Sequence, residues 1–428
     1  MAVSTARAGV GQRAGLLALL MALPLAGCRP APGPDGAGAD ANLRGSIVMA
    51  VGVNNDVTID AALLEELNRR VGDLIHSYRN LHPRVRVEVQ PFQEDRLARE
   101  MERRSRDGLA PDLLMVNTST ALTLAQMGVV RPIRLSAEMT DQLDRGSLER
   151  VRLPDGQLIG LPLLIQPQVA CYDRRRVPVP PATLEALLAR DGGRMQVGLP
   201  IDAINLAWTL GPLGALDTVK RLSAGEPETS ADRARLRAWL EWLGNAHLQQ
   251  GIHFLSNQED LLKGLVSGRL DWISCRSTHL GRLRLRLGRH LGVALLPSGP
   301  GGPASPINRE RLLAFGINST TSQAQVAESL ARFSINPLVQ RTITLRSLDS
   351  LPVNRNLRPP VGSSHVLDTL VAARAQGDAT QDSLPLRHTD AYASDRFRGL
   401  LTRYLYGEMD AREAAETLAR SLGRRGGR

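Results

Sequence analysis

The residue types that most often carry out catalysis occur in this sequence without the spacing that catalysis needs. Eight histidines are present, but none forms a His-Glu-x-x-His pair. His247 and His253 are six residues apart, a spacing that does not place two zinc ligands on one helix face. No Gly-x-Ser-x-Gly segment marks a nucleophile turn. These patterns predict neither metal-dependent nor serine-dependent chemistry.

Paired carboxylates and glycine-rich turns lead to the same conclusion. Glu65 with Glu66, and Glu94 with Asp95, lie in charged stretches that we interpret as solvated helix faces rather than glycosidase pairs. The prolines of Gly-Pro-Gly-Gly-Pro at 299–303 lack backbone donors, so this cluster is a turn and not a phosphate cradle. We expect no catalytic residue, no metal and no cofactor. An enzymatic function remains an alternative only if residues that are distant in sequence converge in the folded protein.

Cys28 indicates chemistry of another kind, the covalent attachment of lipid. Arg7 and Arg13 precede an apolar run at 16–25 that is too short to span a bilayer. The run ends in Leu-Ala-Gly-Cys at 25–28, which resembles the bacterial lipobox, where a peptidase cuts before a lipid-modified cysteine. We expect a lipoprotein signal peptide over 1–27, and an ordinary secretory signal is the alternative.

The segment after Cys28 predicts a tether rather than a folded part of the chain. Residues 28–43 hold three prolines and little apolar bulk. No later segment offers roughly 18 uninterrupted apolar residues, so the N-terminal lipid is expected to be the membrane attachment. These features predict a periplasmic or otherwise extracytoplasmic, lipid-anchored body with a short basic tail at 423–428.

Length and charge limit the remaining possibilities. About 400 residues exceed what one hydrophobic core usually organises, which favours two lobes. The formal charge is +10, but Lys is almost absent and Arg is spread along the whole chain. We interpret this as a solvated arginine-rich surface and expect no nucleic-acid partner.

Two cysteines remain once Cys28 is assigned to lipid. An oxidising compartment permits a disulfide between Cys171 and Cys275, and two separate buried thiols are the alternative. The bridge would close a loop of about a hundred residues, which the chain-entropy model values at roughly 4 to 5 kcal/mol.

Short β-rich runs alternate with amphipathic stretches along the chain. Strands are predicted at 46–51, 85–89 and 112–116, with one helix carrying Leu63 to Tyr78 and a charged helix at 94–106. This order predicts parallel strands joined by right-handed crossovers. The second half repeats the pattern, with predicted strands at 196–199, 270–275 and 291–295, and helices around Trp208 and at 232–248, 366–375, 394–406 and 411–422.

Several ordered segments together resemble one family. They include Ala-Pro-Asp-Leu-Leu-Met-Val-Asn at 110–117, Gly-Gln-Leu-Ile-Gly-Leu-Pro at 156–162, the segment 262–276 ending Leu-Asp-Trp-Ile-Ser-Cys-Arg, the loop at 293–306, and Tyr-Gly-Glu-Met-Asp-Ala-Arg-Glu-Ala-Ala-Glu at 406–416. This set is similar to the extracellular solute-binding proteins of ABC importers, which include maltose-binding and other sugar-binding proteins. The resemblance extends from about residue 45 to residue 422.

The resemblance implies an α/β fold of the two-lobed type II periplasmic-binding-protein class. Doubly wound sheets are joined by crossover segments, and solute is held in the cleft between lobes by hinge closure. Crossovers are expected near Gln168, Pro306 and Pro352. The N-terminal lobe would comprise 44–168 with 306–352, and the C-terminal lobe 169–305 with 353–422.

Polar residues that follow strands at such a cleft are expected to bind the solute. Gln166 and Gln168 flank the first crossover. The other candidates are Asn54, Asn55, Asn117, Thr118, Ser119, Asp202, Asn205, Trp208, Trp272, Arg276, Ser277, Asn308, Arg309 and Asn354. For each polar residue, a solvated turn or a helix cap is the alternative.

The choice of solute is open on sequence grounds. Aromatic residues make up only 3% of the chain, although pyranose rings are commonly held against Trp or Tyr. Trp208, Trp272 and Tyr172 are best placed for such stacking, with core packing as the alternative for Trp208. Arg276 and Arg309 instead indicate an anionic or phosphorylated solute, because a guanidinium binds such oxygens bidentately.

The resemblance therefore implies a binding lipoprotein of an ABC importer for a sugar, polyol or glycoside, with a phosphorylated polyol as the nearest variant. The expected partners are a small-molecule solute and the permease subunits, and the protein is expected to be monomeric and not an enzyme. The alternative is a binding-protein-like envelope lipoprotein with a sensing or assembly role. Permease genes beside its own would favour transport.

Overall fold

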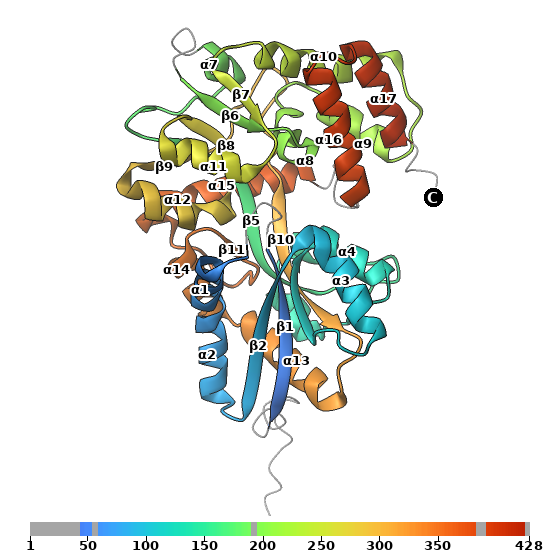
Figure 1. The fold of residues 1–428 in the computed structure, drawn as a ribbon, viewed down its shortest axis with the longest axis vertical. Coiled ribbons are helices and arrows are strands. Elements are labelled where there is room, and N and C mark those ends of the chain that lie inside the picture. Colours follow the sequence, from blue (N-terminus) through green and yellow to red (C-terminus); the bar gives the residue numbers. More distant parts are fainter. Residues whose placement is uncertain (1–42, 54–58, 190–194, 382–390, 424–428) are drawn as a thin grey trace, which may run out of the picture. The chain divides into compact units, whose positions relative to one another are not determined.

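The computed structural model describes residues 43–53, 59–189, 195–381 and 391–423. Within these ranges the fold is mixed α/β (Figure 1). Its strands form a sheet with the order β2-β1-β3-β10-β5-β8-β6-β7, and β4, β9 and β11 pair beside this path. The predicted signal peptide with Cys28, Asn54 and Asn55 lie outside the described residues. Among the residues that are described, no helix is long and apolar enough to cross a bilayer.

The first part of the sheet is parallel, as the order of elements predicts. β1 (Gly45–Val53) pairs with β2 (Val85–Gln93) on one side and with β3 (Leu113–Asn117) on the other. β1 is buried on both faces over its second half because it lies inside the sheet, whereas β2 shows partial exposure. Helices connect these strands: α1 (Ala61–Arg70), α2 (Gly72–Leu81) and α3 (Glu94–Arg106).

The single helix predicted to carry Leu63 to Tyr78 is two helices in the structure. α1 ends at Arg70 and α2 begins at Gly72, with Val71 between them. Glycine has a low helix preference, which makes Gly72 a favourable place for the interruption. The elements that follow are α4 (Thr118–Gln126), β4 (Val130–Arg131), α5 (Ala137–Gln142) and α6 (Arg145–Arg150).

The second parallel group is made by β6 (Val197–Pro200), which lies between β7 (Ile252–Leu255) and β8 (Trp272–Arg276). The long helix predicted around Trp208 is only α8 (Ala203–Leu206) and a 3-10 turn, because Gly211 and Pro212 follow closely. The helices of this part are α7 (Leu184–Ala189), α9 (Leu216–Ser223), α10 (Ser230–His247), α11 (Gln258–Ser267) and α12 (Leu280–Leu287).

Two strands, β5 and β10, connect these groups, and we call them the crossover strands; only β5 pairs with strands of both groups. β5 (Leu161–Asp173) pairs antiparallel with β10 (Asn308–Gly316) along its first half (Figure 1). From Gln168 onward it pairs instead with β8 and with β9 (Leu291–Ala294). The first crossover was predicted near Gln168, where β5 changes partner. The exact lobe boundaries stay a prediction.

The last part of the chain returns to both groups. α13 (Thr321–Ser334) packs against β1, and α14 (Pro337–Ser347) leads into β11 (Leu351–Pro352), which pairs with β5. α15 (His365–Gln381) packs against β5, β9, β10 and β11, and so lies along the crossover strands. α16 (Ala391–Leu405) and α17 (Ala411–Gly423) pack against α10.

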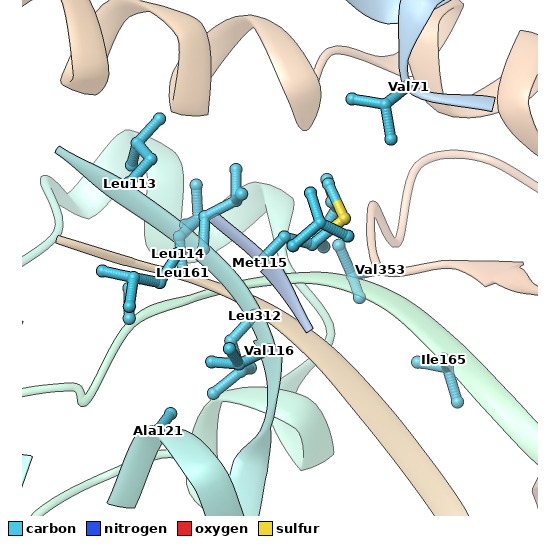
Figure 2. Packing of buried hydrophobic residues seen from close by; sticks show 14 of the residues in the cluster. Val71, Leu113, Leu114, Met115, Val116, Ala121, Leu161, Ile165, Leu312 and Val353 are labelled. Carbon is cyan, nitrogen blue, oxygen red and sulfur yellow. The ribbon is translucent and has the colours of Figure 1, made fainter. Parts of the chain in front are cut away.

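The second half of β5 lies between two hydrophobic clusters. Ile165, Val169 and Cys171 lie on one face and join, with Leu161 and Leu163, a cluster that runs from the first strand group to α11 and α12. Figure 2 shows part of this cluster, with Leu114 of β3, Leu161 of β5 and Leu312 of β10. Ala170 and Tyr172, on the opposite face, join a second cluster with α10, α16 and α17.

Cys171 and Cys275 form a disulfide in this structure. The two residues lie on β5 and β8, their Cα atoms are 5.7 Å apart, and both side chains are buried. The bridge joins positions separated by 104 residues. It therefore fastens the second half of β5 to the second strand group.

A buried ionic network fastens α15 to the crossover strands on the face that carries the first core. Arg150 pairs with Glu310 of β10, and both side chains are almost fully buried. Arg150 also donates to Asp378 of α15 at 3.1 Å, and Arg374 of α15 pairs with Asp144. Burial alone would raise the pKa of Asp144, but the charge of Arg374 and the Ser147 N–H bring it below its usual value.

Disulfide formation predicts that the chain unfolded in denaturant without reductant shows no thiol from Cys171 or Cys275. Replacing both by Ala should lower the free energy of unfolding by roughly 4 kcal/mol, because the unfolded chain regains the entropy of a long loop. Thiol titration and denaturant unfolding measure the two effects. Two reactive thiols in the unreduced chain would contradict the bridge.

The buried ion pair predicts that Arg150→Met lowers the free energy of unfolding by about 3–5 kcal/mol, because the Glu310 charge loses its main partner. Arg150→Met with Glu310→Met should recover much of that loss. Arg152→Met is the matched control, since Arg152 pairs with Glu149 at the surface and should cost less than about 1 kcal/mol. Equal losses for Arg150→Met and Arg152→Met would contradict this assignment.

Candidate functional site

Polar side chains gather on one face of the crossover strands. Gln166 and Gln168 point to the same side of β5, opposite to the side that carries Ile165 and Val169. Across the sheet Gln166 lies opposite Arg309 of β10, and Gln168 lies opposite Arg276 of β8. Directly opposed residues share a face, and Arg311 follows Arg309 on it by the same alternation. We call the side chains of Gln166, Gln168, Arg276, Arg309 and Arg311 the crossover face.

Asn205 joins three residues of the crossover face. Its side-chain oxygen accepts from Arg276 Nε at 3.2 Å and from Arg309 Nη2 at 3.5 Å. Its backbone oxygen accepts from Gln168 Nε2 at 2.8 Å. These residues, predicted from separate segments, therefore meet at one place in the structure.

The position of Asn205 depends on α8, which is short but well capped. Asp202 is the N-cap, and its side chain accepts from the N–H groups of Ile204 at 2.8 Å and Asn205 at 3.2 Å. Asn205 itself is 3% exposed. Asp202 thus supports the site by fixing the turn that carries Asn205.

The sequence did not predict the second polar cluster, which lies where β1 and β3 end. Arg311 donates to Glu94 Oε1 at 2.7 Å, and also to the backbone oxygens of Gly52 at 2.7 Å and Met115 at 2.9 Å. Glu94 accepts from the Asn117 N–H at 3.1 Å and from the Thr120 hydroxyl. The side chains of Glu94 and Arg311 are 9% and 15% exposed.

Glu94 was assigned to a solvated helix face from the sequence, and that interpretation is wrong. Glu94 is the first residue of α3 and directly follows β2, so it lies at the edge of the sheet where parallel strands end. The sequence does contain one signal of this cluster. Arg309 and Arg311 are two residues apart on β10, and this spacing places both guanidinium groups on one face of the sheet.

Asn117 and Thr118 lie at this same edge. Asn117 caps α4, because its side-chain oxygen accepts from the Thr120 N–H at 2.9 Å and the Ser119 hydroxyl at 2.7 Å. The Thr118 hydroxyl is buried and has no hydrogen-bond partner in the described part of the chain. Asn117 and Ser119 thus have local structural roles, and Thr118 has a polar atom that the described fold does not use.

Asn308 and Asn354 were predicted to bind solute, but the structure places them elsewhere. Asn308 lies opposite Pro167 on the other face of β10 and donates to Arg374 O and Asp378 Oδ1, both at 2.9 Å. Asn354 donates to Ile335 O at 2.9 Å. Each is 1% exposed, so their side chains hold α15 and the end of α13 in place.

The aromatic residues also depart from the prediction. Trp208 and Trp272 are fully buried in the second core cluster, with ring centroids 6.4 Å apart, and Tyr172 is 5% exposed. Their rings pack against other side chains and do not present a face for stacking in this conformation. Ser277 is likewise buried, and its hydroxyl has no hydrogen-bond partner among the described residues.

Gly52 is the position where a side chain would disturb the Glu94 cluster. A Cβ at this residue would lie 2.5 Å from Glu94 Oε1. Gly52→Ala should therefore displace the Glu94 carboxylate and lower the free energy of unfolding by about 1–3 kcal/mol.

Gly72→Ala is the matched control for this substitution, because a Cβ there meets no atom within 4 Å and alanine favours the helix. Denaturant unfolding of both variants measures the difference. If Gly52→Ala were as stable as Gly72→Ala, the close approach of Glu94 to β1 would be unimportant.

Comparison with known proteins bears on most of the chain. Residues 73–365 match the model of the bacterial extracellular solute-binding protein family. A search of curated proteins finds no match. Since the family model spans more than half of the chain, the match establishes the family.

Solved structures agree with this assignment at the level of the fold. The GacH receptor of Streptomyces glaucescens, solved unliganded and with acarbose, is 14% identical with a TM-score of 0.70, covering 89% of this chain and 99% of its own. An ABC transporter solute-binding protein of Thermotoga lettingae, bound to α-D-tagatose, is 15% identical with a TM-score of 0.66, covering 89% and 100%. The maltose/maltodextrin-binding domain of Bdellovibrio bacteriovorus, bound to maltotriose, is 15% identical with a TM-score of 0.66, covering 89% and 99%.

These likenesses confirm the predicted two-lobed α/β fold. With the family match, they show that this chain belongs to the bacterial extracellular solute-binding proteins.

Proposed function

We propose that this chain captures a sugar, polyol or glycoside on the crossover face and delivers it to the permease subunits of an ABC importer. The observation that supports this most is that Arg309 and Arg311, on one face of β10, contact polar groups of the second and of the first strand group respectively. Asn205 and Arg276 come from the second group, while Glu94 comes from the first. A solute that contacts both sets would favour a closed arrangement of the lobes.

The similar structures support a sugar-like solute, because those proteins were solved with tagatose, acarbose and maltotriose bound. Amide and guanidinium groups such as those of Gln166, Asn205 and Arg309 suit hydroxyl-rich compounds, since together they supply donors and acceptors. Binding and release would leave the solute chemically unchanged.

The family works outside the cytoplasm, and we propose that a lipid on Cys28 holds the protein at the membrane. Residues 28–43 would act as a tether of a monomeric binding body. Lipidation would add a diacylglyceryl group to the Cys28 sulfur, so mass spectrometry of the mature N-terminus tests this anchor. An N-terminus other than a lipid-modified Cys28 would contradict it.

Titration calorimetry of the chain with a panel of hexoses, polyols, glycosides and their phosphates tests solute capture. At least one member should bind, and its binding should lower the radius of gyration measured by small-angle X-ray scattering, because the lobes close. Asn205→Ala should weaken binding about 10-fold or more, since it removes the acceptor that orients two arginines.

Asn356→Ala serves as the control for Asn205→Ala, because Asn356 is exposed and its N–H bonds to Asn354, whose side chain bonds in turn to Ile335. It should leave the affinity unchanged. A chain that binds no member of the panel, or returns a chemically altered compound, would refute the proposed function.

A further inference from the structure

We infer that the solute carries an oxyanion, a carboxylate or a phosphate, and that Arg276 and Arg309 bind it together on the crossover face. This rests on the proposed function and specifies the class of solute that the same site takes. An anionic sugar or polyol is the class that fits.

The first step is the placement of the two guanidinium groups. Arg276 extends from β8 and Arg309 from β10, the two strands on either side of β5. Both side chains reach the same oxygen of Asn205, at 3.2 Å and 3.5 Å. Two guanidinium groups that share one small acceptor are close enough to share one small anion.

The second step is the fixed geometry of this pair. Asn205 is buried, its own backbone is held by Gln168, and its N–H bonds to Asp202. Arg276 and Arg309 are each partly exposed, so they lie at the boundary between the core and solvent. A guanidinium held in place loses less entropy on binding, which favours bidentate contact with carboxylate or phosphate oxygens.

The third step concerns hydroxyl groups beside Arg276. Ser274 precedes it on the same face of β8, and Ser277 follows it directly. Both are fully buried, and neither hydroxyl has a hydrogen-bond partner in the described ranges. Buried polar atoms of this kind call for an explanation, and an oxyanion held by Arg276 would bring acceptors toward them.

The fourth step is electrostatic. The carboxylate of Glu94 faces the crossover face from the first strand group but is paired with Arg311 at 2.7 Å. Its negative charge is therefore largely compensated and repels an anion only weakly. Stacking on Trp208 or Trp272 does not supply an alternative source of affinity, because both rings are buried.

The test compares matched solutes on the full-length chain in mild detergent by titration calorimetry. Hexoses, pentitols and glycerol are each measured beside their carboxylates and their monophosphates. The anionic member of at least one set should bind 10-fold or more tightly than its neutral counterpart, and added salt should reduce this preference. The ranking of carboxylate against phosphate identifies the oxyanion.

Arg276→Gln and Arg309→Gln should each weaken binding of the anion about 10- to 100-fold and weaken binding of the neutral counterpart by a smaller factor, so that most of the preference for the anion is lost. Arg286→Gln, an exposed position on α12, is the control and should change neither. Circular dichroism checks that the variants fold, and the comparison on the unsubstituted chain is decisive if one does not.

Neutral members binding as tightly as anionic ones would overturn this inference and leave the proposed function intact. Anion binding that both arginine variants retain would overturn the assignment of the site. Absence of binding by every solute would refute the inference and the proposed function together.

Discussion

The pairing of β5 with two different sets of strands determines where the polar groups of the site lie. Ile165, Val169 and Cys171 are buried on one face of this strand, and Cys171 is bridged to β8. A shift of one residue would turn these apolar side chains to the opposite face and carry Gln166 and Gln168 into the core. The core therefore fixes the register, and the register fixes the crossover face.

The two faces of the crossover strands have different functions as a result. On one face Glu310 and Asn308 join the network of Arg150, Asp378 and Arg374 that holds α15. On the other, Arg309 contacts Asn205 and Arg311 contacts Glu94. Alternation along a single strand, Asn-Arg-Glu-Arg, thus separates the side chains that hold α15 from those on the crossover face.

Much of the fold could be predicted from the sequence because its signals are local. The strands of the first group are runs of apolar residues, and their order with amphipathic stretches predicts a parallel arrangement. The division of one helix at Val71 and the shortness of α8 were missed, because helical periodicity continues through Gly72 and past Trp208. The segment that marks the first crossover was found through its resemblance to a family rather than through periodicity.

The site could be predicted only in part, because side-chain direction depends on strand register. Four residues predicted to bind solute do lie together, namely Gln168, Asn205, Arg276 and Arg309. Asn308, which was also predicted, faces the other side of β10. The pair of Glu94 and Arg311 joins residues 217 positions apart, which no spacing rule reveals. Trp208 and Trp272 are residue types that can stack on a sugar ring, but both side chains are fully buried in the core.

The most direct test of this account is a crystal structure of the chain with its solute bound. The account predicts that the solute contacts Arg276, Arg309 and Asn205 on one side and the Glu94 cluster on the other, with the lobes closed over it. A solute bound on the α15 face of the crossover strands, or away from these strands altogether, would contradict it.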